Sequence, residues 1–555
     1  MNNRLMLACS LLAAVGMGCK PTYKPDPVVV DDEWQPAEEG VVYTLAGSQL
    51  DAAGKGTRVT IQAMQGLVNR SSPRVFFAVE GGDAHDANFF DALSRTYGIE
   101  AEPQQDPLWY VWAFADELDG YILYKNTNRD SATVATALAG VLNAVPIDQL
   151  SQEDLKLVDE ELGLTQVLDV REWTQDDLLT SEYWGSFTPG MVMSEPFTGP
   201  ENTSHDFGVS RGYPFYFGDP REDATLADYE PIWDAIGADA PVFGWTYTDS
   251  DYPAALFVEP LSERGAAFVP TDKANNLSFY AHYPLIGPME QQAAEPVDDV
   301  VEKHFVAFVM SDGENVGTVM GRMTNPDVGN FSPTESYPMG WTLPGELYEL
   351  AGPVLQYLYD SAHDSDAFIL GASGHTLMYP SAWADTAAWK AATEADMEQL
   401  DTDYVTVLDV PDAFEAGSAD PLAEIPRAKA VFFASNDDDP SSAEVDEWDA
   451  HEIRWVGDVP VIPMLKLGFE EDVEKTIDVI DDFAERVGER AVADVTSSFG
   501  YTVVYVNVHK TRLSDLEALE GEFEAWLDDA EADFDIEVIR PDQLVSVLLE
   551  HRPPG

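Results

Sequence analysis

Apolar runs that alternate with amphipathic stretches fill the second half of the chain. Most of these runs are continuously apolar, which is typical of strands buried on both faces of a parallel sheet. Strands are predicted at His304–Met310, Ala367–Gly371, Tyr404–Asp409, Ala430–Ala434, Val461–Leu465, Thr502–Asn507 and Ile536–Ile539.

Helices are predicted between many of these strands. One apolar stripe comprises Val473, Ile477, Ile480 and Val487, and another comprises Leu516, Leu519, Phe523 and Trp526. Ser514 and Glu517 have the spacing of a capping box at the start of the second of these helices. About seven strand–helix units favour a (β/α) barrel, with an open doubly wound sheet as the alternative. In both folds, ligands bind at the carboxyl ends of the strands.

The first half of the chain has a less regular pattern. Val59–Arg70 has one apolar face at helical spacing, and short strands are expected at Arg74–Val79, Pro241–Trp245 and Asn276–Tyr283. The polar, Pro-containing segment Gln291–Asp299 suggests a boundary. We therefore expect an α/β protein: a mixed α/β N-terminal domain over residues 43–292, followed by a barrel-like domain over residues 293–555.

The N-terminus has the features of a secretory signal. Arg4 precedes an apolar run that reaches Val15, and small residues lead to Cys19. A cysteine at this place resembles a bacterial lipoprotein cleavage site, which predicts a lipid on Cys19; plain cleavage nearby is the alternative. Residues 1–18 would then be the signal peptide and residues 19–42, rich in Pro and acidic residues, a tether. This predicts an exported protein held at a membrane by its lipid.

Charge narrows the classes of partner. The 555 residues include 101 Asp and Glu against 30 Lys and Arg, which gives a formal net charge of −71. Nucleic acid would be repelled by such a protein. Only 12 of the basic residues are Lys. This lysine-poor, acidic composition favours a salt-adapted (halophilic) surface over a dedicated cation-binding role.

Two carboxylates follow the first predicted barrel strand. Asp312 and Glu314 lie just past Met310, with Gly313 between them. On an extended chain they would point to the same side about 6.5 Å apart. Two carboxyl groups at this range can share acid and base work in glycosidic cleavage, although they could equally hold a hydrated cation or cap a helix.

Other chemistry-bearing side chains lie at or near strand ends. Asp409 is the candidate for a second carboxylate supplied by another strand. Sugar-binding roles are predicted for polar residues, and for aromatic residues that could stack on sugar rings or pack in the core. These candidates are Asn315, His375, Asn436, Lys466 and His509, together with Trp341 and Tyr379.

The chain lacks the sequence motifs of several classes of enzyme. The chain has no Gly-rich phosphate loop with Lys, no Gly-x-Ser-x-Gly elbow and no HExxH sequence. Its 9 His show no pair at zinc-ligand spacing, and its only two cysteines are Cys9 and Cys19, near the N-terminus. We therefore predict no metal and no cofactor.

Three motifs of the second half resemble one known family. They are Ser311-Asp312-Gly313-Glu314-Asn315, Pro338-Met339-Gly340-Trp341 and the segment Gly374–Pro380. This combination resembles the glycoside hydrolase family named for its GxGYxYP motif. Glu314 replaces that family's usual Asp, and Thr376 and Leu377 replace a Gly and a Tyr of the naming motif.

Segments of the first half also fit the partner domain of that family. They are Gln65–Arg70, the stretch GWTYTDSDYP that leads to Glu259, and Asn275–Pro284. The resemblance implies a two-domain exported bacterial protein with a barrel-like C-terminal domain that acts on carbohydrate.

The leading hypothesis is therefore a glycoside hydrolase in which Asp312 and Glu314 divide the acid and nucleophile or base roles. The alternative is a glycan-binding surface lipoprotein without catalysis, which the altered naming motif favours. A structural protein that collects divalent cations is a third reading.

Overall fold

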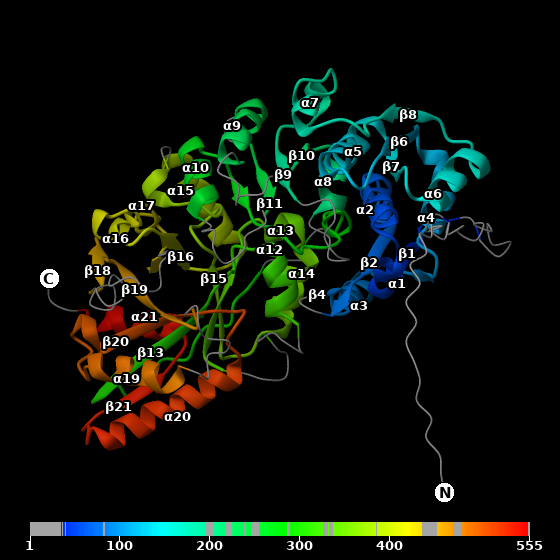
Figure 1. Cartoon of the computed structure of the whole chain (residues 1–555). Coiled ribbons are helices and arrows are strands. Elements are labelled where there is room, and N and C mark those ends of the chain that lie inside the picture. The colour runs from blue at the N-terminus through cyan, green and yellow to red at the C-terminus, as the bar shows by residue number, and fades with distance from the viewer. Residues whose placement is uncertain are drawn as a thin grey trace, which may run out of the picture.

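The computed structural model describes residues 35–552 except 36, 39, 82–83, 195–203, 218–224, 238–239, 246–254, 284, 286–288, 326–330, 332–336, 384–385, 436–451 and 470–478. The predicted signal peptide, Cys19 and most of the predicted tether lie outside the described residues. Figure 1 shows an N-terminal half on one side of the molecule and a barrel built from the C-terminal half on the other.

Seven parallel strands of the C-terminal half close into a barrel. β13 pairs with β20 along its length and with β14 at its end, which completes the ring. In order around the ring the strands are β13 (Lys303–Met310), β14 (Met339–Leu343), β15 (Asp366–Leu370), β16 (Tyr404–Asp409), β17 (Ala430–Ser435), β19 (Val459–Leu467) and β20 (Tyr501–Val506). The predicted α/β class with a barrel-like C-terminal region is thus confirmed.

The last strand departs from the arrangement of a regular eight-stranded barrel. β21 (Asp535–Val538) pairs with the first residues of β13, on the edge that β14 occupies further along. It therefore does not insert between β20 and β13, where the eighth strand of a regular barrel would close the ring. β18 (Arg454–Val456) is an antiparallel addition to β19.

Alternation along β13 explains how the barrel is filled. Phe305, Ala307 and Val309 belong to one buried cluster, and the even-numbered residues between them belong to another. The odd-numbered cluster includes residues of most barrel strands and of α21 (Pro541–Glu550). The even-numbered cluster continues into the surrounding helices, so the odd-numbered residues face the barrel interior.

Helices of the C-terminal half cover the barrel or follow its strands. They are α12 (Val316–Thr318), α13 (Leu347–Leu350), α14 (Gly352–Ser361), α15 (Thr386–Gln399), α16 (Asp412–Ala416), α17 (Asp420–Ala423), α19 (Ile480–Arg490) and α20 (Leu513–Asp529). The predicted cap of the last of these is wrong: α20 begins at Leu513, and the Asp515 carboxylate accepts from the Arg512 N–H at 2.9 Å.

Three small parallel sheets form the N-terminal half. The first contains β1 (Val42–Ala46), β2 (Val75–Ala78) and β5 (Ala101–Gln104), and the second β6 (Gly120–Tyr124), β7 (Ala144–Asp148) and β8 (Gln166–Asp169). The third contains β9 (Met191–Met193), β10 (Phe215–Tyr216), β11 (Val242–Gly244) and β12 (Phe268–Val269). Helices of this half include α2 (Lys55–Asn69), α3 (Asp86–Tyr97), α5 (Arg129–Leu142), α8 (His205–Arg211), α9 (Thr225–Ile236) and α10 (Ala255–Arg264).

One predicted strand of this half is a helix. Asn276–Tyr283 contains α11 (Leu277–Tyr280), which Asn276 precedes in the left-handed region at φ 60°. The Asn276 side chain accepts from the Phe77 N–H at 2.8 Å and donates to the Phe77 carbonyl at 2.9 Å. The Asn276 side chain thus occupies the backbone groups of Phe77 that a neighbouring strand would otherwise pair with. The alternation of apolar residues in Asn276–Tyr283 does not reveal this.

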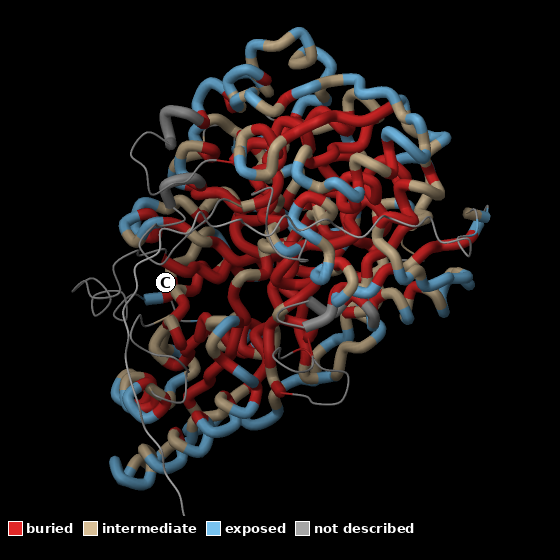
Figure 2. Tube along the Cα trace, turned by 45° about the vertical axis from the view of Figure 1, so that its right-hand side comes forward, coloured by how far each residue is buried: buried red, intermediate tan, exposed pale blue. Residues whose placement is uncertain are grey.

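The segment that carries the naming motif docks the two halves together. The Leu377 N–H donates to the Phe268 carbonyl of β12 at 3.0 Å, and the Tyr379 N–H donates to the Ser262 hydroxyl of α10 at 3.0 Å. Leu377 and Tyr379 share a buried cluster with Tyr229 of α9. Figure 2 shows buried residues running through both halves. No helix among the described residues is long and apolar enough to cross a membrane.

Candidate active site

The turn after β13 carries the first group of candidate residues. The Asn315 N–H donates to the Asp312 carbonyl at 3.1 Å, and the Asn315 side chain accepts from the Thr318 N–H, which caps α12. Asp312 has a φ of 61°, a left-handed conformation that Asp tolerates better than most residues. The chain therefore turns at Asp312, and the spacing of about 6.5 Å expected for an extended chain does not apply.

Asp312 contacts its own turn and the loop after β20. The Ser311 hydroxyl donates to the Asp312 carboxylate and accepts from the Val508 N–H at 3.2 Å. His509 Nε2 lies 3.9 Å from Asp312 Oδ1. The loop after β20 therefore brings His509 to the carboxylate, as expected for strand ends that meet at one rim of a parallel barrel.

Glu314 has one carboxyl oxygen without a hydrogen-bond partner. Its Oε2 atom is buried and has no hydrogen-bond partner in the structure. Burial, the negative charge of Asp312 and, to a smaller extent, that of Asp272 raise the pKa of Glu314 to about 8. Glu314 therefore keeps its proton at neutral pH, which is the state that a general acid requires.

Asp272 is a third carboxylate of this group, and the sequence analysis missed it. It follows β12 in the N-terminal half, and its Oδ1 accepts from Asn315 Nδ2 at 2.6 Å. Burial raises its pKa, while the Asn315 hydrogen bond and the charge of Lys273 oppose the rise. Because β12 has only two residues, Phe268 and Val269, the sequence contains no strand pattern that would mark Asp272 as a strand-end residue.

Aromatic side chains form the barrel side of the site. The Tyr505 side chain belongs to the cluster that fills the barrel, and burial together with the charges of Glu314 and Asp312 raises its pKa well above the usual range. Phe469 stacks on it with ring centroids 5.6 Å apart, and Lys466 Nζ lies 5.8 Å from the Phe469 centroid. Lys466 thus lies at the periphery of the site, next to Phe469.

His375 lies in a second acidic cluster, on the loop after β15. Its Nδ1 is 2.7 Å from Asp396 Oδ2, and its side chain is 36% exposed whereas that of Asp396 is 3% exposed. Burial alone would lower the pKa of His375, but the Asp396 hydrogen bond and the charge of Glu346 raise it to about 9. Burial raises the pKa of Glu346 to about 8, and its Oε1 has no hydrogen-bond partner.

The remaining predicted residues have other surroundings. Asp409 is buried, and its carboxylate accepts from the Ser381 N–H, the Ser381 hydroxyl and the Val410 N–H at 2.6–2.9 Å. Trp341 is 1% exposed and donates to Asp366 Oδ1 at 2.7 Å, and Tyr379 is also 1% exposed. None of these three side chains faces solvent. Asn436 lies outside the described residues.

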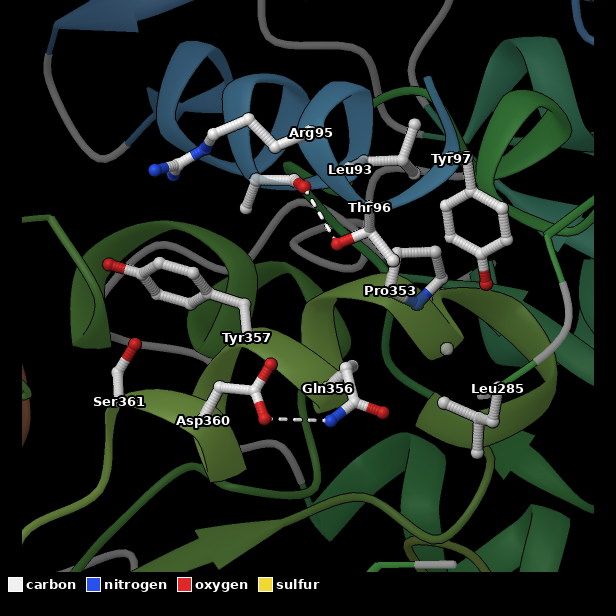
Figure 3. A pocket seen from close by; sticks show the side chains of 12 residues that line it. Leu93, Arg95, Thr96, Tyr97, Leu285, Pro353, Gln356, Tyr357, Asp360 and Ser361 are labelled. Atoms are coloured by element: carbon white, nitrogen blue, oxygen red, sulfur yellow. Dashed lines mark hydrogen bonds between the residues drawn. The ribbon is translucent and has the colours of Figure 1, made fainter. Parts of the chain in front are cut away.

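A pocket of about 310 Å³ lies between α3 and α14, and none of the predicted site residues lines it (Figure 3). Tyr97 and Tyr357 stand at opposite ends of it, and Gln356 donates to Asp360 at 2.9 Å. Gln356 Oε1 is buried without a hydrogen-bond partner. Among the described residues, no group of three or more His, Cys, Asp or Glu side chains is placed to hold a metal ion.

A protonated glutamic acid beside an aspartate, at the strand-end rim of a parallel barrel, is an arrangement typical of hydrolases that use general-acid catalysis. Two models of one family match the chain: "GxGYxYP putative glycoside hydrolase C-terminal domain" at residues 302–548 and "GxGYxYP_N second domain" at residues 118–187. Together they span more than half of the chain, which belongs to the GxGYxYP family.

One solved structure has the same fold over nearly the whole chain. It is a crystal structure called a putative hydrolase, from Bacteroides thetaiotaomicron VPI-5482. The match has a TM-score of 0.75 and 20% sequence identity, and it covers 94% of this chain and 97% of that one. No curated protein matches the chain.

Proposed function

We propose that this protein is a glycoside hydrolase whose proton donor is Glu314. The observation that carries the proposal is the contrast between two adjacent carboxyl groups. Glu314 has a buried oxygen without a partner and a pKa raised to about 8, whereas Asp312 accepts from Ser311 and lies near His509. Environments that separate two carboxyl groups in this way assign the acid and the base.

In the proposed reaction, Glu314 gives its proton to the glycosidic oxygen as the bond to the anomeric carbon breaks. The Asp312 carboxylate, on the same turn, either attacks that carbon or activates the attacking water. Tyr505 and Phe469 offer an aromatic wall beside the reacting carbon. The exposed His509 side chain would hold a sugar hydroxyl group, whereas the Asn315 amide is occupied by Asp272 and by the cap of α12.

The experiment is a screen of oligo- and polysaccharides for new reducing ends, followed by variants on each positive substrate. Glu314→Gln and Asp312→Asn are each expected to lower kcat by about 10²–10⁴-fold while leaving the midpoint of thermal unfolding nearly unchanged. NMR of the first-formed anomer then shows retention or inversion. Full activity in both variants would refute the proposal.

Binding without cleavage is the second candidate, and the pocket between α3 and α14 favours it. An aromatic ring at each end and a carboxylate–amide pair suit a sugar ring, whose faces stack and whose hydroxyls pair with polar groups. The unpartnered Gln356 Oε1 would accept from such a hydroxyl. On a glycan array, binding that Tyr357→Ala weakens, with no product from any bound glycan, would support this candidate over hydrolysis.

The proposed location is outside the cytoplasm, with a lipid on Cys19. The support is the sequence alone: an apolar run after Arg4 that ends in small residues before this cysteine. Cys19→Ser is expected to move the protein from the membrane fraction to the soluble fraction. Membrane retention of this variant would contradict the lipid anchor and leave the proposed hydrolysis untouched.

A further inference from the structure

The loop after β12 joins the N-terminal half to the carboxylates of the barrel. We propose that Asp272 belongs to the same active site as Asp312 and Glu314, so that the N-terminal half supplies a positioning residue for the proton donor. This inference rests on the proposed hydrolase function and adds a third carboxylate to it. It also gives the N-terminal half a part in the chemistry.

On the barrel side, the loop is clamped to the turn that carries the candidate acid. The Val316 N–H donates to the Pro270 carbonyl at 2.9 Å, and Asn315 Nδ2 donates to Asp272 Oδ1 at 2.6 Å. Gly317 lies so close that a Cβ atom there would be 1.7 Å from the Asp272 carbonyl oxygen. Only glycine fits at this position, so the close contact between α12 and the loop depends on Gly317.

On the N-terminal side, buried polar groups hold the same loop. Thr271 Oγ1 accepts from the Ser204 hydroxyl at 2.7 Å and from the Gly244 N–H at 2.8 Å. Asn276 Oδ1 accepts from Gln65 Nε2 of α2 at 2.6 Å. Because these groups are buried and hydrogen-bonded, they fix the loop within narrow limits. Asp272 therefore has a defined position.

The position of Asp272 matters because its negative charge acts on Glu314. Asn315 donates to Asp272, which favours the ionised form of that carboxyl group. A negative charge close to Glu314 makes ionisation of Glu314 less favourable, since two like charges in a buried site repel. Asp272 accordingly contributes to the raised pKa of Glu314, after burial and Asp312. Removing its charge should let Glu314 lose its proton at lower pH.

The test is a pH titration of Glu314 itself. The infrared band of its protonated carboxyl group is isolated as the difference between the full-length protein and Glu314→Gln. In Asp272→Asn, which can still accept from Asn315, the midpoint of this band is expected to fall by roughly one pH unit. Where a substrate is found, the alkaline limb of the pH–rate profile should fall by the same amount.

A second variant shifts the position of Asp272 without replacing any charged residue. Gly317→Ala displaces the loop and is expected to lower the same midpoint. Gly521→Ala is the matched control, because Gly521 is also helical and a Cβ there meets nothing within 4 Å. Glu346→Gln, which removes an acid of similar pKa in the other cluster, should leave the Glu314 band in place.

Two outcomes separate the two proposals. An unchanged midpoint in both Asp272→Asn and Gly317→Ala would overturn this inference, even if Glu314→Gln abolishes hydrolysis. Hydrolysis at the full rate in Glu314→Gln would overturn the proposed function, while the band titration would still report whether Asp272 acts on Glu314.

Discussion

Two half-buried glutamates follow neighbouring barrel strands, and their pKa values are raised to nearly the same level by different neighbours. Burial is the main cause for both, and it raises each pKa to about 8. Glu314 has carboxylates as neighbours, Asp312 and Asp272, which raise its pKa further. Glu346 has the imidazole of His375 as its strongest charged neighbour, which lowers its pKa and offsets part of the effect of burial.

The difference shows why a raised pKa alone does not mark a catalytic acid. Near Glu314, Asp312 lies on the same turn, 3.9 Å from the exposed imidazole of His509, and Asp272 lies on the loop after β12. Around Glu346 the charges are paired within the cluster, through the His375–Asp396 contact of 2.7 Å. Both glutamates have one carboxyl oxygen without a partner, so the difference lies in their neighbours. The Asp396 carboxylate near Glu346 is paired with an imidazole, whereas the carboxylate on the turn of Glu314 is free to work with an acid that donates its proton.

The largest expected effect separates the two glutamates by activity. Glu314→Gln should lower kcat by about 10²–10⁴-fold, because the leaving oxygen loses its proton donor. Glu346→Gln should keep most of the activity. The measurement is kcat on one substrate at pH 6–7 for both variants. Equal losses would show that the comparison between the clusters is wrong.

The next effect concerns stability and pH. Glu346 has a pKa of about 8 when folded and 4.5 as its model value, so between these pH values the folded state binds one proton more than the unfolded state. Stability must then fall as pH rises from 4.5 to 8, by at most about 1.4 kcal/mol per pH unit for this group. Glu346→Gln should remove this slope. Urea unfolding at a series of pH values checks it, and an unchanged slope would contradict the assignment.

A smaller effect tests the charge of His375. Its pKa is raised to about 9, so its contribution to stability is present below its model value of 6.5 and is lost as pH rises through 9. His375→Gln should make the free energy of unfolding less dependent on pH between 6.5 and 9. It should also raise the titration midpoint of the Glu346 infrared band by roughly one pH unit. The Glu314 band is the internal control, and a shift there would mean that the two clusters are coupled.

The smallest effect concerns a buried carboxylate that is fully hydrogen-bonded. Asp409 shares with Glu314 its position at a strand end, but it accepts from Ser381 and Val410. Ser381→Ala removes one donor and should lower the free energy of unfolding by about 1 kcal/mol, with activity retained. Chemical denaturation and kcat measure the two outcomes. A large loss of activity would give Asp409 a role in the site.

Local pattern was enough where burial alone decides the structure. Continuously apolar runs such as Tyr404–Asp409 are strands in the barrel, because such segments bury both faces. β14 was not predicted, since Met339–Leu343 is short, contains a glycine and follows a proline. The grouping of Asp312 with Asn315 and His509 follows from strand order alone, because parallel strand ends meet at one rim.

The sequence by itself determined the α/β class, most barrel strands and the place of Asp312 and Glu314 just past the first of these strands. The tertiary structure alone decided which carboxyl group keeps its proton, because that depends on burial and on charges distant in the chain. It also decided that Asp272, about 40 residues before Glu314 and in the other half, is hydrogen-bonded to Asn315, the residue after Glu314. The hydrogen bonds from Ser381 to Asp409 were equally beyond local pattern, since a different loop supplies the donors.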